Sequence, residues 1–130
     1  MYKANTRGIE VTVAPSFLPE HSSVEKSRYV WAYDVEIRNL SDVSVQLRHR
    51  YWTITDGTGH VERVEGPGVV GEEPVIASGE SFRYNSGCPL TTPTGFMVGQ
   101  YEMETAGGER FLVDVPAFSL DLPDARRTMN

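Results

Sequence analysis

Three glycines between residues 66 and 71 have a spacing that can serve phosphate binding. Gly66, Gly68 and Gly71 read G-x-G-x-x-G, a pattern whose missing side chains let a backbone approach a pyrophosphate closely. In a dinucleotide fold the third glycine opens a helix, whose amides and dipole hold the phosphate. Here Glu72-Glu73-Pro74 follows, and the β-like Val75-Ile76 comes next. The context therefore favours a structural loop, with phosphate or nucleotide binding by backbone amides alone as the alternative.

A kinase-like glycine loop lies between two strands and needs no helix, but it needs other groups. That chemistry uses a lysine on a following strand and an Asp/Asn metal site. The sequence has no lysine after Lys26, and the carboxylates of Glu72 and Glu73 would repel an anion. If the loop does bind phosphate, we expect Arg63 or Arg83 to supply the positive charge.

The histidines and the acidic residues near one turn are the candidate metal ligands. His21, His49 and His60 lack the spacing of a zinc or transition-metal site. His60 and Glu62 share one strand face beside a turn that bears Asp56, and carboxylates suit magnesium. Direct divalent-cation binding is therefore a further alternative, whereas a solvated hairpin tip is the simpler interpretation, and we assign no metal ligand.

Nucleophilic catalysis finds little support. Cys88 is the only cysteine, so it forms no internal disulfide, which agrees with a reducing compartment. No base lies near Cys88 in the sequence, and we expect a packed thiol rather than a reactive one. The serines lack a G-x-S-x-G elbow. We expect no enzymatic activity and no cofactor.

Composition and charge bound the partners. The 130 residues carry 18 acidic and 12 basic side chains, a formal charge of −6, which disfavours binding to a phosphate backbone. A basic strip is the exception to test, because Arg48 and Arg50 are predicted on one strand face and Arg63 and Arg83 on neighbouring strands. No apolar run is long enough to span a bilayer, so we expect a cytoplasmic protein without nucleic-acid or membrane partners.

Alternating hydrophobicity predicts the strands that must position these residues. From Tyr29 to Arg38 one face is apolar and the other charged, which indicates a half-buried strand, and residues 9–13 repeat the pattern. Residues 19–27 are predicted as a loop. Between Ser44 and Asp56 the apolar residues change parity, which predicts a bulge near Arg48 to Tyr51.

Turn signals divide the rest of the chain. Asp56-Gly57-Thr58-Gly59 predicts a hairpin that returns through Val61 to Val64, and a further strand is predicted over residues 80–86. The strands 96–105 and 109–118 flank Ala106-Gly107-Gly108, a second hairpin turn. About seven to nine short strands predict an all-β, immunoglobulin or fibronectin type III-like sandwich of two antiparallel sheets. We expect one domain over 1–130, with 122–130 as a flexible tail.

Several segments, in order along nearly the whole chain, resemble the ApaG family. They are Ile9-Glu-Val-Thr-Val, Tyr33-Asp-Val-Glu-Ile-Arg-Asn, Arg50-Tyr-Trp-Thr-Ile-Thr-Asp, Val64-Glu-Gly-Pro-Gly-Val-Val-Gly-Glu-Glu-Pro, Tyr84-Asn-Ser-Gly-Cys-Pro-Leu, Thr94-Gly-Phe-Met-Val-Gly and Val115-Pro-Ala-Phe-Ser-Leu. The resemblance implies a fibronectin type III-like sandwich and a link to cobalt resistance and magnesium efflux. Similar domains in eukaryotic F-box and polymerase-interacting proteins imply protein binding.

Together these observations predict a non-enzymatic binding module. We expect its loops or an open sheet edge to bind a protein partner, which could add a strand, and the same edges could form a homodimer. A phosphate or nucleotide sensor built on Gly66, Gly68 and Gly71 is one alternative, and direct divalent-cation binding is the other.

Overall fold

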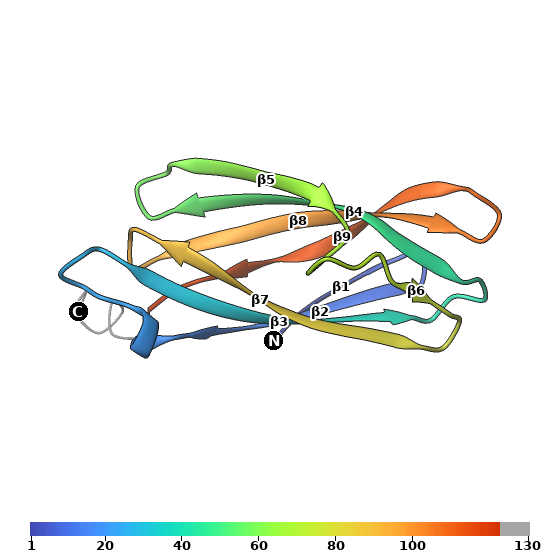
Figure 1. Cartoon of the computed structure of the whole chain (residues 1–130), viewed down its shortest axis with the longest axis horizontal. Coiled ribbons are helices and arrows are strands. Elements are labelled where there is room, and N and C mark those ends of the chain that lie inside the picture. The colour runs from blue at the N-terminus through green and yellow to red at the C-terminus, as the bar shows by residue number, and fades with distance from the viewer. Residues whose placement is uncertain (123–130) are drawn as a thin grey trace.

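The strands form two packed antiparallel sheets, as predicted (Figure 1). The computed structural model describes residues 1–122. One sheet has the order β1-β2-β3-β7, and the other has the order β5-β4-β8-β9 with β6 also paired to β4. In chain order the elements are β1 (Tyr2–Thr6), β2 (Ile9–Phe17), the 3-10 helix η1 (Pro19–His21), β3 (Tyr29–Asn39), β4 (Val45–Asp56), β5 (Val61–Pro67), β6 (Val75–Ile76), β7 (Ser81–Leu90), β8 (Gly95–Thr105) and β9 (Arg110–Ser119).

The alternation of apolar and polar residues in the sequence matches the alternation of buried and more exposed residues in β2 and β3. Side chains that the pattern places inward are buried between the sheets, whereas Asp34 and Arg38 of β3 are exposed. Because successive side chains of a strand point to opposite faces, one apolar parity suffices to build each half of the core. The largest fully buried side chains include Ile9, Ile37, Leu47, Met97, Tyr101 and Phe118.

The predicted bulge in β4 is confirmed. The pairing of β4 with β8 shifts between Leu47 and His49, so that Leu47 before the bulge and Trp52 after it are both buried. The shift also separates two arginines that we expected on one face. Arg48 pairs with Glu104 of β8 at 3.6 Å, whereas Arg50 turns into the space between the sheets with Trp52.

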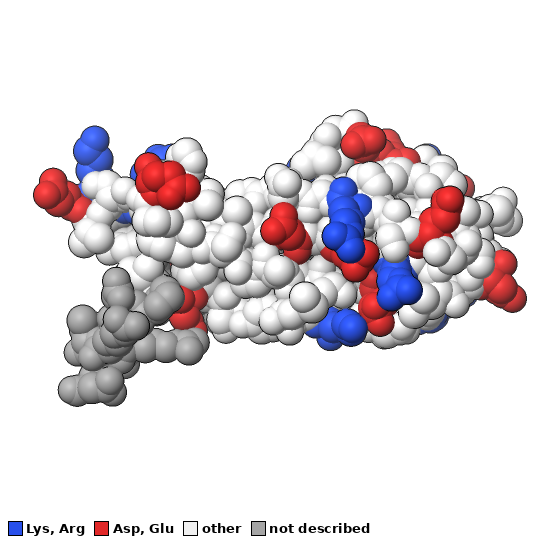
Figure 2. Space-filling model, turned by 90° about the horizontal axis from the view of Figure 1, so that it is seen from below, with Lys and Arg blue, Asp and Glu red and all other residues white. Residues whose placement is uncertain are grey.

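The basic strip is therefore absent from the part of the chain that the structure describes. Arg48 also pairs with Glu73 at 3.3 Å, and Arg83 pairs with Glu36 at 2.9 Å on the other sheet. On the face shown in Figure 2, basic side chains lie beside acidic ones rather than in a continuous row. Pairing with carboxylates thus interrupts the predicted strip at Arg48 and Arg83.

Three strand predictions needed correction. β5 runs to Pro67, so the glycine run begins inside a strand rather than after it, and β7 continues past Ser86 to Leu90. β1 is a separate strand that pairs with β2 across the turn at Arg7 and Gly8, which the alternation did not separate from β2. Leu122 packs against the core, and the rest of the expected tail, 123–130, lies outside the described residues.

The sandwich is closed on one side and open on the other. On the closed side β1 lies against β9, and the Asp114 amide donates to Thr6 Oγ1 at 3.1 Å. On the open side β5 and β7 are the edge strands of the two sheets, and the segment between β5 and β6 lies across this side (Figure 1). No helix within residues 1–122 has the length and apolarity needed to cross a membrane. The open side is where the candidate site lies.

Candidate functional site

A pocket of about 340 Å³ lies between the two sheets at the open side of the sandwich. β3, β4 and β8 supply its inner wall, β5 and β7 form its two long sides, and Val69 and Val70 of the glycine run cover one end. The residues that carry its chemistry are Tyr33, Arg50, Trp52, Glu62, Tyr84 and Cys88. The pocket thus brings together parts of the chain that are far apart in sequence.

The glycine run forms a tight hairpin turn over Val69 to Glu72. The amide of Val69 donates to the Glu72 carbonyl at 2.8 Å, and the amide of Glu72 donates back at 2.9 Å. The two central residues, Val70 and Gly71, have φ values of 44° and 80°. Two positive φ angles in a two-residue loop are typical of a type I′ turn. The structural loop predicted for this run is therefore what the chain forms.

Each glycine of the motif has a different structural reason. Gly68 has a φ of +59°, and a Cβ there would lie 2.0 Å from the Glu72 carbonyl oxygen. Gly71 needs its positive φ but has open space around it. A Cβ on Gly66 would lie 3.1 Å from two nitrogens of the Arg50 guanidinium. The G-x-G-x-x-G spacing here serves a tight turn and an arginine.

Arg50 of β4 holds this loop in place through hydrogen bonds. Its Nη1 donates to the carbonyl oxygens of Pro67 and Gly68, both at 3.0 Å. Residue 50 lies directly opposite Gly66 in the pairing of β4 with β5. The positive charge beside the loop therefore comes from Arg50, and our expectation of Arg63 or Arg83 was wrong: Arg63 is exposed on β5 and Arg83 pairs with Glu36.

Most amides of the loop already have partners. The amide of Gly68 donates to the Arg48 carbonyl at 3.0 Å, and those of Val69 and Glu72 donate to each other's carbonyls. Within the described residues this leaves Val70 and Gly71 as the loop amides without a hydrogen bond. Phosphate binding by the loop of Gly66, Gly68 and Gly71 stays a prediction, and the amides of Val70 and Gly71 are the ones that could donate to a phosphate.

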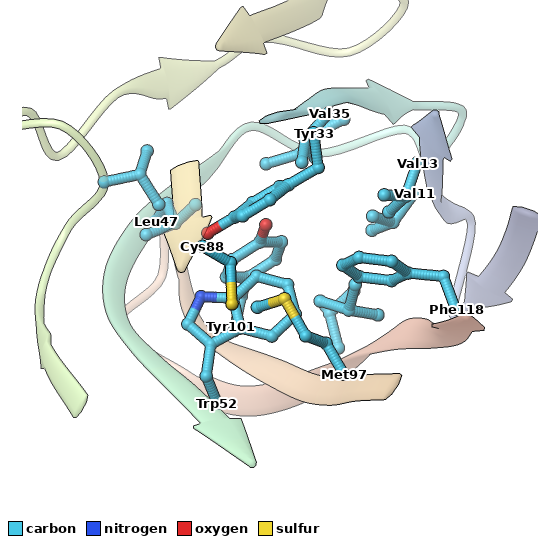
Figure 3. Close-up of a cluster of buried hydrophobic side chains, with 14 of the residues drawn as sticks. Val11, Val13, Tyr33, Val35, Leu47, Trp52, Cys88, Met97, Tyr101 and Phe118 are labelled. Carbon is cyan, nitrogen blue, oxygen red and sulfur yellow. The ribbon is translucent and has the colours of Figure 1, made fainter. Parts of the chain in front are cut away.

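Three tyrosines surround the buried side of Arg50. The hydroxyls of Tyr84 and Tyr101 hydrogen-bond to each other across the two sheets. Figure 3 shows Tyr33, Trp52 and Tyr101 packed together in the core beside Cys88. Burial raises the pKa of Tyr33, Tyr84 and Tyr101, and the nearby Arg50 charge opposes the shift only in part. Their hydroxyls stay protonated near neutral pH, and Tyr33 and Tyr84 border the pocket.

Cys88 is a packed thiol, as expected. It is buried on β7, where burial first and the nearby Glu62 carboxylate second raise the pKa of its thiol to about 11. The thiolate is the nucleophilic form of cysteine, so this environment suppresses its reactivity. No catalytic role follows from its position beside the pocket.

We expect the Cys88 thiol to react with Ellman's reagent about 100-fold more slowly in the folded protein than in the denatured chain, because its pKa lies about two units higher. A raised pKa means that the folded thiol keeps its proton as the pH rises past the value at which the denatured thiol ionises. The folded rate should therefore still increase between pH 9 and 11, where the denatured rate levels off. Folded and denatured rates within fivefold of each other would contradict the assignment.

Three of the candidate metal ligands lie near the turn that follows β4. Asp56 Oδ1 accepts hydrogen bonds from the Thr58 amide at 2.9 Å, the Thr58 hydroxyl at 2.7 Å and the His60 amide at 3.1 Å. These bonds, led by the Thr58 hydroxyl, lower the pKa of Asp56. Asp56, His60 and Glu62 all border a shallow cavity of about 220 Å³. Within residues 1–122 no group of three or more His, Cys, Asp or Glu side chains is placed to hold a metal ion.

The other two histidines have separate surroundings. His49 Nε2 lies 3.4 Å from a Glu65 carboxylate oxygen, and His21 is exposed in η1. Neither His21 nor His49 borders the cavity that His60 lines. Direct cation binding therefore stays a prediction that rests on Asp56, His60 and Glu62.

Sequence reasoning missed Arg50, although a signal was present. If the turn pairs Asp56 with His60, the hairpin register places Arg50 opposite Gly66, as the structure shows. The parity change after the predicted bulge then points Arg50 inward with Trp52. Counting register from the turn would have identified an arginine facing a glycine at the sheet edge.

Comparisons with known proteins agree with this architecture. The family model for the ApaG domain matches residues 19–105. A Brucella anthropi protein named ApaG is 59% identical over 130 residues, and an ApaG from Allorhizobium ampelinum is 61% identical over the same length; the match covers 100% of both chains in each case.

Solved structures show the same fold. A Bordetella pertussis protein described as ApaA superposes with a TM-score of 0.86 at 43% identity, covering 88% of this chain and 94% of that one. The C-terminal domain of wzt superposes with a TM-score of 0.56 at 8% identity, covering 92% of this chain and 76% of that one. This second likeness concerns the fold alone.

Proposed function

The chain belongs to the ApaG family, and we propose that it is a non-enzymatic binding module that accepts an extended segment of a partner protein at the free edge of β5. The observation that carries this proposal is the exposure of β5, in which every residue except the half-buried Gly66 is exposed. An edge strand with free N–H and C=O groups is a ready template for another strand.

The other sheet edges are less suited to strand addition. β1 and β9 lie against each other on the closed side of the sandwich. β7 carries Pro89, which lacks an N–H donor, within its edge. Between Val61 and Gly66, β5 has no proline. A continuous row of backbone groups therefore favours β5 as the docking edge.

The register of β5 shows which residues offer their backbone groups. The Asp56 amide donates to the His60 carbonyl at 3.0 Å, so residues 56 and 60 form a hydrogen-bonded pair. Hydrogen-bonded and non-hydrogen-bonded pairs alternate along an antiparallel ladder. Glu62 and Val64 thus bond β4, whereas Val61 and Arg63 direct their N–H and C=O groups to the free edge. Exposed side chains of Val64 and Val70 add apolar surface beside it.

This proposal makes the link to cobalt resistance and magnesium efflux indirect, through the partner protein. It also supports a second possibility at the same edge. Two copies pairing through β5 would form a homodimer with the same free backbone groups.

Replacing Arg63 by proline tests the proposal. The proline removes an outward N–H without removing a β4–β5 hydrogen bond, so we expect partner binding to fall at least about tenfold while the fold persists. Arg63→Ala is the matched control, because it shortens the side chain but keeps the amide. Partners captured from a bacterial lysate would be identified by mass spectrometry and then remeasured as purified proteins with both variants.

Hydrogen exchange gives the structural readout. Binding of the purified partner should protect the amides of Val61 and Arg63 from exchange. Equal binding by Arg63→Pro and Arg63→Ala, or no protection along β5, would overturn strand addition. Sedimentation of the protein alone separates a heterologous partner from a second copy of the chain.

A further inference from the structure

We propose that the pocket between β5 and β7 binds a small aromatic molecule bearing one carboxylate or phosphate group, with the charged group at Arg50 and the ring against Tyr33 and Trp52. This site lies between the sheets and is separate from strand addition at the outer edge of β5. The proposal rests on the unused donors of Arg50, the aromatic wall, the strained lip of the pocket and its charge distribution.

Arg50 has donors left for an anion. Its Nη1 is occupied by the two loop carbonyls, whereas Nε and Nη2 have no hydrogen bond or ion pair with the described residues. These two nitrogens form one side of the guanidinium fork, the side that binds a carboxylate or phosphate with two parallel hydrogen bonds. The same pair of Arg83 nitrogens binds Glu36 at 3.1 and 2.9 Å.

Arg50 also differs from the paired arginines in its charge environment. Arg7, Arg48, Arg83 and Arg110 each pair with a carboxylate of the chain, but Arg50 is half-buried without one among residues 1–122. A charge removed from water is costly unless an opposite charge or hydrogen bonds compensate it. The loop carbonyls supply part of that compensation, and an anionic ligand would complete it.

The inner wall suits a flat apolar body. The rings of Tyr33 and Trp52 are packed edge to face with centroids 5.6 Å apart, and both residues border the pocket. Ser86 and Tyr84 border it as well. Apolar surface with a few converging polar groups is the common composition of small-molecule sites.

The lip of the pocket holds a strained residue. Val70 has a φ of 44°, a conformation that a β-branched residue adopts only under constraint, and its side chain is 56% exposed at the pocket. Such strain costs about 1–3 kcal/mol and is concentrated at ligand clamps and active sites. An exposed valine held in this way is placed to close over an apolar ligand.

Charge and size restrict the ligand further. Glu62 borders the pocket from β5, four residues before the Gly66 that faces Arg50, which is about 13 Å along the strand. The pocket therefore has a positive end at Arg50 and a negative end at Glu62, which disfavours polyphosphates. Its volume of about 340 Å³ is at the lower end for small-molecule sites, and it favours a single-ring ligand over a dinucleotide.

An NMR titration of the full chain with three probes tests the site. Phenylacetate and phenyl phosphate carry the proposed anion, and phenylacetamide is the neutral match. We expect the amide signals of Gly66, of residues 68–70 and of residues 84–88 to shift and saturate with either anion, with dissociation constants below about 5 mM. Phenylacetamide should bind at least about tenfold more weakly, as expected for the loss of a charged hydrogen bond.

Three variants assign the effect to its residues. Arg50→Gln should weaken both anions at least about tenfold. Glu62→Gln should strengthen them about two- to fivefold, and more for phenyl phosphate, because a repulsive charge is removed. Glu65→Gln changes the same strand outside the pocket and should leave both affinities within twofold. If the NMR spectrum of Arg50→Gln shows that this variant is unfolded, the comparison of Glu62→Gln with Glu65→Gln tests the site instead.

The proposal is overturned if neither anion saturates at 10 mM, or if phenylacetamide binds as tightly as phenylacetate. It is also overturned if Glu62→Gln and Glu65→Gln bind phenyl phosphate equally. Arg63→Pro, which blocks the β5 edge, should bind the probes like the wild type. If the probes bind but no partner protein does, strand addition fails and this site stands. If a partner binds but the probes do not, this site fails and strand addition stands.

Discussion

Replacing Gly68 by alanine should lower the free energy of unfolding by about 2–5 kcal/mol. Two costs add: a positive φ costs an L-residue about 1–2 kcal/mol, and forcing a methyl group into filled space costs about 1–3 kcal/mol. The second cost is unavoidable here, because the new Cβ would lie 2.0 Å from the Glu72 carbonyl oxygen, a backbone atom. Urea denaturation followed by tryptophan fluorescence measures the change.

Gly71→Ala is the matched control for this prediction. Gly71 shares the loop and a positive φ of +80°, but nothing lies within 4 Å of its Cβ position. It should therefore cost only the conformational part, about 1–2 kcal/mol. A Gly68→Ala variant no less stable than Gly71→Ala would mean that the turn is not as tight as the structure shows.

Gly68→Ala should also weaken the anion site. The Gly68 carbonyl accepts a hydrogen bond from Arg50, so displacing the loop displaces the guanidinium. The Arg50 guanidinium bonds the carbonyls of Pro67 and Gly68 and not that of Gly71. We therefore expect Gly71→Ala to retain probe binding. Stability and binding thus change together at one glycine and separately at the other.

Replacing Phe118 by alanine should cost about 3–5 kcal/mol, the range for truncating a buried phenylalanine. Phe118 of β9 is 1% exposed, and its ring centroid lies 5.6 Å from that of Tyr33 and 6.0 Å from that of Trp52. It also lies 6.1 Å from Tyr2 of β1. The ring therefore joins both sheets at the centre of the core (Figure 3), and its removal leaves a cavity that neither sheet can fill without moving.

Phe96 is the control, because the same substitution is made there at an exposed position. It lies on β8, the neighbouring strand, and is 46% exposed. Phe96→Ala should cost less than about 1 kcal/mol, because little apolar surface is lost from the interior. Denaturation of both variants in urea gives the difference. Equal losses for the two phenylalanines would contradict the assignment of Phe118 to the shared core.

The strands with one buried face were predictable, and the edge strands were predictable only in part. β3 alternates between buried and exposed residues along its whole length, so the sequence shows its period directly. β5 has no buried residue, and its end at Pro67 leaves no hydrophobic signal. Alternation reports burial, so a strand without a buried face carries no period to detect.

The candidate site divides in the same way. The sequence marked the glycine motif and indicated a loop from Glu72-Glu73-Pro74, and the turn at Val70 and Gly71 agrees. It did not show that Gly66 makes room for Arg50, because that contact joins residues 16 positions apart through the β4–β5 register. It also did not show that Tyr84 of one sheet bonds Tyr101 of the other.

What the sequence alone determined is the all-β sandwich, the bulge in β4 and the packed character of Cys88, since these follow from local period and composition. Only the tertiary structure decided the meaning of the G-x-G-x-x-G run. The motif forms a tight turn over Val69 to Glu72, and the β4–β5 pairing places the Arg50 guanidinium beside it. The physical reason is that register, sheet packing and charge burial are properties of paired strands, which no single segment contains.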